Sequence, residues 1–192
     1  DGGQDNYPFM KERGWETPSK WSFAIITDLH IGRGYSDYDG MGYENSGEGE
    51  DYYLTERLKK VVDWINENKN NINCEGTQCS IKFLAVLGDI ADTAEKSEFL
   101  KAKSILDKLN DPNGDGNTAD GIPYVPVFGN HDVWPYTENE EATSSLGEQY
   151  FDEIFWDENA TNAKLMKEKL DFIRDDANPD YKNFAFKYNE IN

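Results

Sequence analysis

The sequence has 192 residues, the size of one domain with a substantial hydrophobic core. Hydrophobic residues make up 37% of it, yet the mean hydropathy is -0.83, so a core must coexist with a very polar surface. The 38 acidic and 19 basic residues give a formal net charge of -19. This charge excludes nucleic-acid backbones and anionic membranes as general partners. No apolar run reaches the roughly 18 residues of a membrane span.

The N-terminal part of the chain is predicted to be irregular before the first strand. Residues 1–20 form this irregular segment, and residues 21–192 are predicted to form a single domain. The first strand is predicted at 21–27, and a long loop rich in glycine and tyrosine follows at 32–53. A loop of this length inside a compact domain is usually functional or disordered. The sequence leaves open whether it walls a substrate site or is an acidic insertion.

Strands and helices then alternate, which predicts a βαβαβ unit. The helices are placed by apolar residues that recur at helical spacing. The predicted elements are a helix at 54–68, a strand at 81–87, a helix at 97–109 and a strand at 122–128. The candidate buried residues are Leu54, Leu58, Val61, Val62 and Ile65 in the first helix, and Phe99, Leu100, Ile105, Leu106 and Leu109 in the second. Pro123 and Pro126 place the last of these strands near a sheet edge.

The C-terminal third is predicted to be helical and to end in a strand. Helices are predicted at 146–155 and 164–173. In the last twelve residues Phe184, Phe186 and Tyr188 alternate with other residues, the period-two pattern of a half-buried strand.

Two cysteines, Cys74 and Cys79, lie close together around Gly76. Such a pair can close a local disulfide, which stabilises by roughly 2 kcal/mol in the chain-entropy model. A disulfide would place the protein in an oxidising compartment, extracellular or periplasmic. The alternative is two unrelated thiols in a loop. A zinc site is discounted because no third or fourth ligand lies nearby.

Three short motifs carry the chemistry, and each directly follows an apolar run. They are Asp-Leu-His at 28–30, Gly-Asp-Ile-Ala-Asp at 88–92 and Gly-Asn-His-Asp at 129–132. In an open sheet, ligands bind outside the carboxyl ends of the strands, so three such ends can bring these side chains together. Carboxylates, an imidazole and an amide oxygen suit divalent cations.

This order of motifs resembles the calcineurin-like metallophosphoesterases, whose pattern is Asp-x-His, Gly-Asp-x-x-Asp and Gly-Asn-His-Asp/Glu. The resemblance covers roughly residues 21–192 and implies an α/β fold, a β-sandwich flanked by helices. The family pattern continues with an isolated His and a Gly-His-x-His, but the chain has only His30 and His131. We therefore expect an N-terminal piece of the fold, its first βαβαβ half plus the following helices. The alternative is a fold that has lost half of its metal ligands.

The resemblance also implies a centre of two divalent metal ions, with Mn, Zn, Fe and Mg all open. Asp28 and His30 would bind the first ion, Asp89 would bridge the two, and Asn130 would bind the second. The centre would activate a water to hydrolyse a phosphate monoester or diester. The chain alone is expected to be inactive, because the downstream histidines are missing. A non-catalytic, cation-binding module of the same fold is the alternative.

The remaining motif residues would have catalytic roles. His131 would stabilise the transition state or protonate the leaving oxygen, and Asp132 would orient its imidazole. Asp92 would support the metal ligands without binding a metal itself. The phosphate ester is the implied substrate. A strand left unpaired at the C-terminus would favour a dimer or a partner chain that completes the fold.

A second ion site is predicted in the polar loop between the second helix and the third strand. Its oxygen ligands recur at alternate positions and a glycine follows at the sixth, as in the opening of a calcium loop. The candidate ligands are Asp111, Asn113, Asp115, Asn117 and Asp120. The twelfth position is Ile122 rather than a bidentate acid, so Asp120 would have to substitute for it. The alternative is an ordinary polar turn.

Overall fold

The computed structural model describes residues 20–32, 50–133, 146–174 and 184–188. The irregular segment predicted at 1–20 therefore lies outside the described residues, except for its last residue. Most of the loop predicted at 32–53 also lies outside them, including its role as a wall of the site. No helix within the described ranges is long and apolar enough to cross a membrane.

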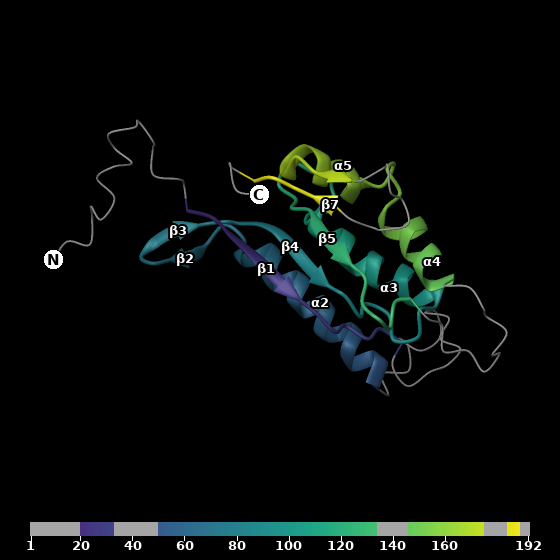
Figure 1. Ribbon diagram of the computed structural model, residues 1–192. Helices are drawn as coiled ribbons and strands as arrows, with labels where there is room; N and C mark the ends of the chain where they lie inside the picture. The colour runs from purple at the N-terminus through teal and green to yellow at the C-terminus, as the bar shows by residue number, and fades with distance from the viewer. Residues whose placement is uncertain (1–19, 33–49, 134–145, 175–183, 189–192) are drawn as a thin grey trace.

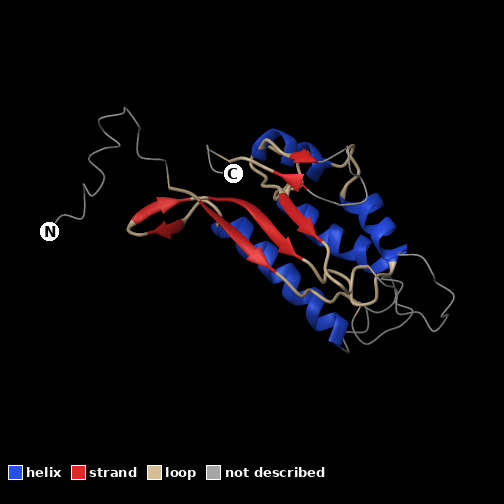
Figure 2. Cartoon of the chain, viewed as in Figure 1, coloured by secondary structure: helices blue, strands red, loops and turns tan. Residues whose placement is uncertain are grey.

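A parallel sheet of three strands forms the centre of the molecule (Figures 1 and 2). Its order is β1 (Ser22–Ile26), β4 (Ile81–Leu87) and β5 (Tyr124–Val127), which confirms the three predicted strands. Leu84 of β4 pairs with a residue of each neighbour, so β4 is central. β5 lies at an edge of the sheet that the described residues form, as its prolines predict.

The helices follow the predicted pattern with shifted ends. α2 (Glu50–Asn68) begins inside the segment predicted as loop, and α3 (Lys96–Leu106) continues into the 3₁₀ turn η2 (Asp107–Leu109). α4 (Leu146–Phe155) has the predicted bounds. α5 (Thr161–Leu170) ends before residue 173, because Asp171 adopts a left-handed φ of 45°. The prediction of helix up to 173 is therefore wrong.

The two faces of the sheet pack against different parts of the chain. Leu84, Val86 and Tyr124 belong to a core that also contains buried residues of α2, α3 and α4. Phe83 and Val125 point to the opposite face and pack against α5 and the C-terminal tail. Alternation along β4 therefore sends side chains into both cores, which is why this strand reads as a continuous apolar run.

Two residues that the helical pattern predicts as buried are exposed. Val61 of α2 is 36% exposed and Leu100 of α3 is 50% exposed. Both lie at the margin of the apolar stripe of their helix, where one step of about 100° separates core from solvent. The remaining candidates in the second helix, Phe99, Ile105, Leu106 and Leu109, are buried.

A short antiparallel hairpin precedes β4 and is absent from the predicted elements. Its strands are β2 (Ile72–Cys74) and β3 (Thr77–Cys79), and Glu75 and Gly76 form the turn with φ values of 53° and 80°. Positive φ at both central residues matches the twist of a two-residue hairpin. The structure pairs Cys74 with Cys79 in a disulfide across this turn.

The C-terminal tail lies against the second face of the sheet. β7 (Phe184–Ala185) pairs antiparallel with β6 (Ile173–Arg174). Phe184, Phe186 and Tyr188 are half-buried while the residues between them are exposed, which confirms the predicted alternation. The regular strand is shorter than predicted.

The part of this second face that lies over β1 is exposed and apolar. Phe23 and Ile25 of β1 are 47% and 55% exposed, and Leu87 at the end of β4 is 50% exposed. A dimer or partner chain that covers this surface stays a prediction.

Candidate metal centre

The three motifs meet beyond the carboxyl ends of β1, β4 and β5. The loops after β1 and β4 remain hydrogen-bonded to each other after the strands end. Asp28 N–H donates to the Gly88 carbonyl at 3.2 Å, and His30 N–H donates to the Asp89 carbonyl at 3.0 Å. This pairing carries the first two motifs side by side into the site, as the sequence predicts.

The backbone at the predicted ligands is strained. Asp28, His30 and Asp89 have φ values of 56°, 46° and 50°, in the left-handed region that residues with a Cβ rarely adopt. Such conformations cost about 1–3 kcal/mol each and persist where the surrounding structure over-determines them. The loop-to-loop hydrogen bonds hold these conformations in place.

Two motif glycines allow the β4 and β5 loops to touch. A Cβ on Gly129 would lie 2.1 Å from Asp89 Oδ1, and a Cβ on Gly88 would lie 2.8 Å from Gly129 N. Gly88 also has a φ of 85°. Any side chain at Gly129 would therefore push the Asp89 carboxylate away from its place.

Two overlapping sets of side chains within the described residues are close enough to hold a metal ion. Asp28, His30 and Asp89 each offer one ligand atom within 4.8 Å of the others. His30, Asp92 and His131 form a second set of the same size. The first set, two carboxylates and an imidazole, fits Mn, Zn, Fe and Mg by the chemistry of its donors. Asn130, the predicted amide ligand, is exposed on the β5 loop beside these residues.

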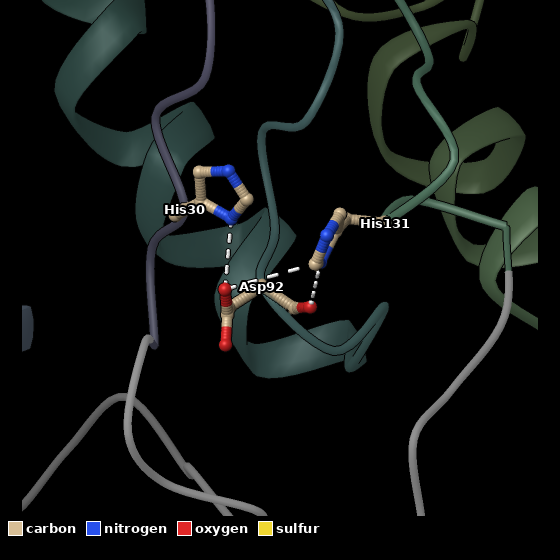
Figure 3. A group of neighbouring side chains, drawn as sticks. All are labelled: His30, Asp92 and His131. Carbon is tan, nitrogen blue, oxygen red and sulfur yellow. Dashed lines mark hydrogen bonds and ion pairs between the residues drawn. The ribbon is translucent and has the colours of Figure 1, made fainter.

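Asp92 holds both histidines (Figure 3). Its carboxylate Oδ1 lies 2.8 Å from His30 Nδ1, and its backbone carbonyl lies 2.7 Å from His131 Nδ1. The two rings stand nearly perpendicular, with centroids 4.6 Å apart. A carbonyl oxygen only accepts, so His131 Nδ1 carries a proton, and the Asp92 carboxylate favours the same tautomer for His30. Nε2 of His30, which lies 3.8 Å from Asp28 Oδ1, is then the ring atom of His30 that could bind a metal.

Asp132 has a different role from the predicted one. It is fully buried, and its carboxylate accepts the N–H groups of Ile90 at 3.2 Å, Ala91 at 2.8 Å and Gly129 at 2.9 Å. The prediction that Asp132 orients the His131 imidazole is therefore wrong, because the ring is held by Asp92 and both Asp132 oxygens bind backbone. Burial raises the pKa of Asp132 to about 6, against the opposing effect of these hydrogen bonds. Asp132 joins the β4 and β5 loops.

Glu98, which is not part of the predicted motifs, holds the loop that follows β4. This fully buried residue of α3 accepts hydrogen bonds from Thr93 N, Thr93 Oγ1 and Glu95 N, each at 3.0 Å. Thr93 directly follows Asp92, so Glu98 fixes the segment that holds both histidines. Burial raises the pKa of Glu98 to about 8, although these hydrogen bonds oppose the shift. The sequence signal is a glutamate three residues after the helix cap at Glu95, a capping-box spacing.

The polar loop at 111–120 is built as a set of turns. Asp111 Oδ2 accepts the Gly116 N–H at 2.9 Å, and Asp115 Oδ1 accepts the Asn117 N–H at 2.7 Å. Asn113 Nδ2 donates to Asp115 Oδ2 at 3.1 Å. Its aspartates form none of the potential metal-binding sets found among the described residues. These contacts match the turn interpretation, and calcium binding stays a prediction.

Comparison with known protein families shows which family the chain belongs to. A family model described as calcineurin-like phosphoesterase matches residues 22–187. The chain belongs to this family. The match runs from the first residue of β1 to the C-terminal tail, and so includes all three motifs of this calcineurin-like phosphoesterase. No curated protein and no solved structure matched the chain.

Proposed function

We propose that this calcineurin-like phosphoesterase hydrolyses phosphoric esters with the help of divalent metal ions. The observation that carries the proposal is the convergence of Asp28, His30 and Asp89 within 4.8 Å, with the His131 ring 4.6 Å from that of His30. When bound, divalent cations would lower the pKa of a water molecule and neutralise charge on the phosphoryl oxygens. A chain with a net charge of -19 would otherwise repel an anionic ester.

Each ligand is held in place by its own contacts. His30 presents Nε2 because Asp92 holds Nδ1 at 2.8 Å. Asp89 Oδ1 accepts the backbone N–H of His131 at 3.0 Å, which fixes the carboxylate and leaves Oδ2 for a second contact. In this proposal Asp89 would bridge two ions, and Asn130 would bind the second one.

His131 is the residue placed to act on the substrate. Its ring lies beside the ligand set, its side chain is 30% exposed, and Nδ1–H is donated to the Asp92 carbonyl. Nε2 is therefore the ring atom that would carry the second proton when the imidazole is charged. In this arrangement His131 donates a proton to the leaving oxygen or a hydrogen bond to the phosphoryl group.

The second candidate is a cation-binding module without catalysis. It is favoured by the histidine count, because both histidines of the chain already lie in the site. The same ligands then bind an ion, but these 192 residues contain no further imidazole that could complete the ligands of a second metal ion. The two candidates differ in turnover and agree in metal binding.

Metal binding and turnover should be measured on the same preparations. The chain is freed of metal with a chelator, titrated with Mn²⁺, and assayed with 4-nitrophenyl phosphate and bis(4-nitrophenyl) phosphate. Asp89→Asn tests the bridging carboxylate, and Asp63→Asn, an exposed aspartate of α2, is the matched control. The 192 residues alone are expected to bind Mn²⁺ with little turnover, and a protein that also carries the downstream histidines is expected to show Mn²⁺-dependent hydrolysis that Asp89→Asn abolishes and Asp63→Asn preserves. Binding without hydrolysis in that longer protein would select the module, and no binding would contradict both candidates.

We also infer an oxidising compartment, extracellular or periplasmic. The support is the Cys74–Cys79 disulfide, since such bonds form and persist in oxidising environments. Thiol labelling of the native protein, isolated from cells under alkylating conditions, should modify neither cysteine until a reductant is added. Labelling of both cysteines without reductant would contradict the inference.

A further inference from the structure

A cavity of about 440 Å³ lies at the end of the sheet opposite the metal centre. Ile81, the first residue of β4, and Ile122, just before β5, line it, so it sits at the amino-terminal ends of these strands. Its charged lining residues are Lys69, Lys82, Lys169 and Asp120. Three cations and one carboxylate thus meet in a chain whose acidic residues outnumber its basic ones two to one, 38 against 19.

Lys69 is the decisive residue of this cavity. It lies directly after α2 and is only 5% exposed. Its Nζ is buried and has no hydrogen-bond partner among the described residues. Burying an ammonium group without a partner is strongly unfavourable, so the position calls for an acceptor. Burial lowers the pKa of Lys69, a shift that Asp120 opposes and the charge of Lys169 increases.

The other two lysines supply charge to the same space. Lys169 Nζ donates to the carbonyl oxygens of Thr118, Ala119 and Gly121 at 3.2, 3.1 and 2.6 Å. These three bonds use its three protons and hold the ammonium at the loop that lines the cavity. The positive charge of Lys82 is felt at Lys169, since it lowers the pKa of that residue alongside burial. Lys69, Lys82 and Lys169 therefore line the same volume, with the buried Lys69 ammonium as the one donor that lacks an acceptor.

We propose that this cavity binds a small oxyanion of the phosphate class, with Lys69 Nζ as the hydrogen-bond donor. With all four charged side chains ionised, the lining carries three positive charges and one negative charge, which complements a dianion. The volume lies within the about 300–1,000 Å³ that is usual for small-molecule sites. The oxyanion is inorganic phosphate or the phosphoryl group of a small ester. The site is separate from the metal centre and does not rest on the proposed hydrolysis.

Phosphate binding should be measured by isothermal titration calorimetry in the presence of EDTA at constant ionic strength. Without divalent cations the acidic metal centre repels phosphate, so the cavity is the site under test. One arm uses inorganic phosphate and a second uses glycerol phosphate, which distinguishes the free ion from a phosphoryl ester. We expect saturable binding by the native chain. Tighter binding of inorganic phosphate would identify the free ion as the ligand, and tighter binding of glycerol phosphate would identify a phosphoryl ester. No saturable binding in either arm would overturn the proposal.

Variants tie the binding to the cavity. Lys69→Met should weaken phosphate binding by at least about tenfold, because it removes a charge-assisted hydrogen bond. Lys82→Gln should weaken it about threefold through loss of one nearby charge. Lys60→Gln, an exposed lysine of α2, and Asp89→Asn in the metal centre should leave the affinity unchanged. Unchanged affinity in Lys69→Met, or loss of affinity in Asp89→Asn, would overturn the proposal.

Thermal unfolding distinguishes a binding role of Lys69 from a purely structural one. A purely structural role would not change the increase in Tm that phosphate causes. Lys69→Met replaces a buried, unpaired charge by an apolar side chain of similar length, so its Tm without phosphate should equal or exceed that of the native chain. Added phosphate should raise the Tm of the native chain and raise that of Lys69→Met by less. Equal phosphate-induced shifts in the two proteins would contradict the assignment. If Lys69→Met does not fold, Lys82→Gln decides, and an affinity equal to the native one overturns the proposal.

Discussion

The two ends of the parallel sheet differ in charge and in backbone conformation. At the carboxyl ends, Asp28, His30 and Asp89 gather on loops with left-handed residues. At the amino ends, Lys69, Lys82 and Lys169 line a cavity beside the starts of β4 and β5. The net charge of -19 is therefore a poor guide to the local field at either end. The carboxyl end is built to attract cations, and the amino end to attract an anion.

The way in which each end is held also differs. The metal-side loops are fixed by a network in which Asp92, Asp132 and Glu98 satisfy backbone or imidazole donors. The lysine end keeps one buried donor, Lys69 Nζ, without a partner. A satisfied polar network holds its members in a single geometry, whereas an unsatisfied donor favours whichever ligand supplies the acceptor. Substitutions at the metal end can rank the contribution of the metal ligands against that of the residues that hold their loops.

The largest effects are expected from the pair Asp89→Asn and His131→Ala. In a protein that also carries the downstream histidines, Asp89→Asn should remove the bound metal and the activity together, because the carboxylate would contact both ions. His131→Ala should keep the metal and lower kcat by about 10²–10⁴-fold, as is typical for loss of a general acid. Metal analysis alongside kinetics on an alkyl and a 4-nitrophenyl phosphate checks this. The loss should be greater for the alkyl ester, which has the poorer leaving group.

Two results would contradict the role given to His131. If His131→Ala loses its metal, the set of His30, Asp92 and His131 is the ion site rather than that of Asp28, His30 and Asp89. If both esters lose activity equally, His131 does not act on the leaving group.

A methyl group at Gly129 should weaken metal binding without direct loss of a ligand. Its Cβ would lie 2.1 Å from Asp89 Oδ1, so the carboxylate must move. We expect the affinity for Mn²⁺ to fall by about 10–100-fold, the range seen when support of a ligand is removed. Gly114→Ala is the control, because its Cβ meets no atom within 4 Å and only its φ of 70° is strained. An Mn²⁺ affinity in Gly129→Ala equal to that in Gly114→Ala would count against the close packing described.

Asp132→Asn should destabilise the fold rather than alter one catalytic step. The carboxylate accepts three backbone N–H groups, and an amide nitrogen would face the Ala91 or Gly129 N–H as a second donor. We expect a loss of about 1–3 kcal/mol in the free energy of unfolding, measured in urea. Asp63→Asn, at an exposed position, should lose almost nothing. Full stability in Asp132→Asn, together with a changed pH profile of activity, would instead indicate that Asp132 orients His131.

The last effect is a pH dependence of stability set by Glu98. Its pKa is about 8 in the folded chain against an ordinary value of 4.5, so the folded state binds more protons than the unfolded state between these values. The contribution of Glu98 to stability therefore falls as the pH rises through this window. In Glu98→Gln this contribution is absent, so the free energy of unfolding should decline less between about pH 5 and pH 8. Parallel curves for the two proteins in urea would show that Glu98 does not titrate there.

The three strands of the parallel sheet, and the functional residues at their carboxyl ends, can be predicted from the sequence. β1, β4 and β5 are apolar runs that end in polar motifs, and parallel strands carry those motifs to one edge, so the meeting of Asp28, His30 and Asp89 could be predicted. The role of Asp132 could not, because its partners are backbone N–H groups of two other segments, which leave no pattern of side chains. Glu98 and Lys69 were missed for the related reason that burial of a charged residue depends on packing between distant elements.

Local errors in the prediction have local causes. The hairpin of β2 and β3 was missed because its strands have three residues each, too few to show alternation. The start of α2 was placed late because tyrosines at 52 and 53 continue the composition of the preceding loop. The end of α5 was placed late because a non-glycine residue, Asp171, terminates the helix in a left-handed conformation.

The position of a bound ion tests the central claim most directly. A crystal of the chain soaked in Mn²⁺ should show anomalous density between the carboxylates of Asp28 and Asp89 and Nε2 of His30. Asp92 should remain on Nδ1 of His30, the contact that the structure shows. A peak confined to the loop at 111–120, a peak held by His131 in place of Asp28, or no peak at saturating Mn²⁺ would contradict the account.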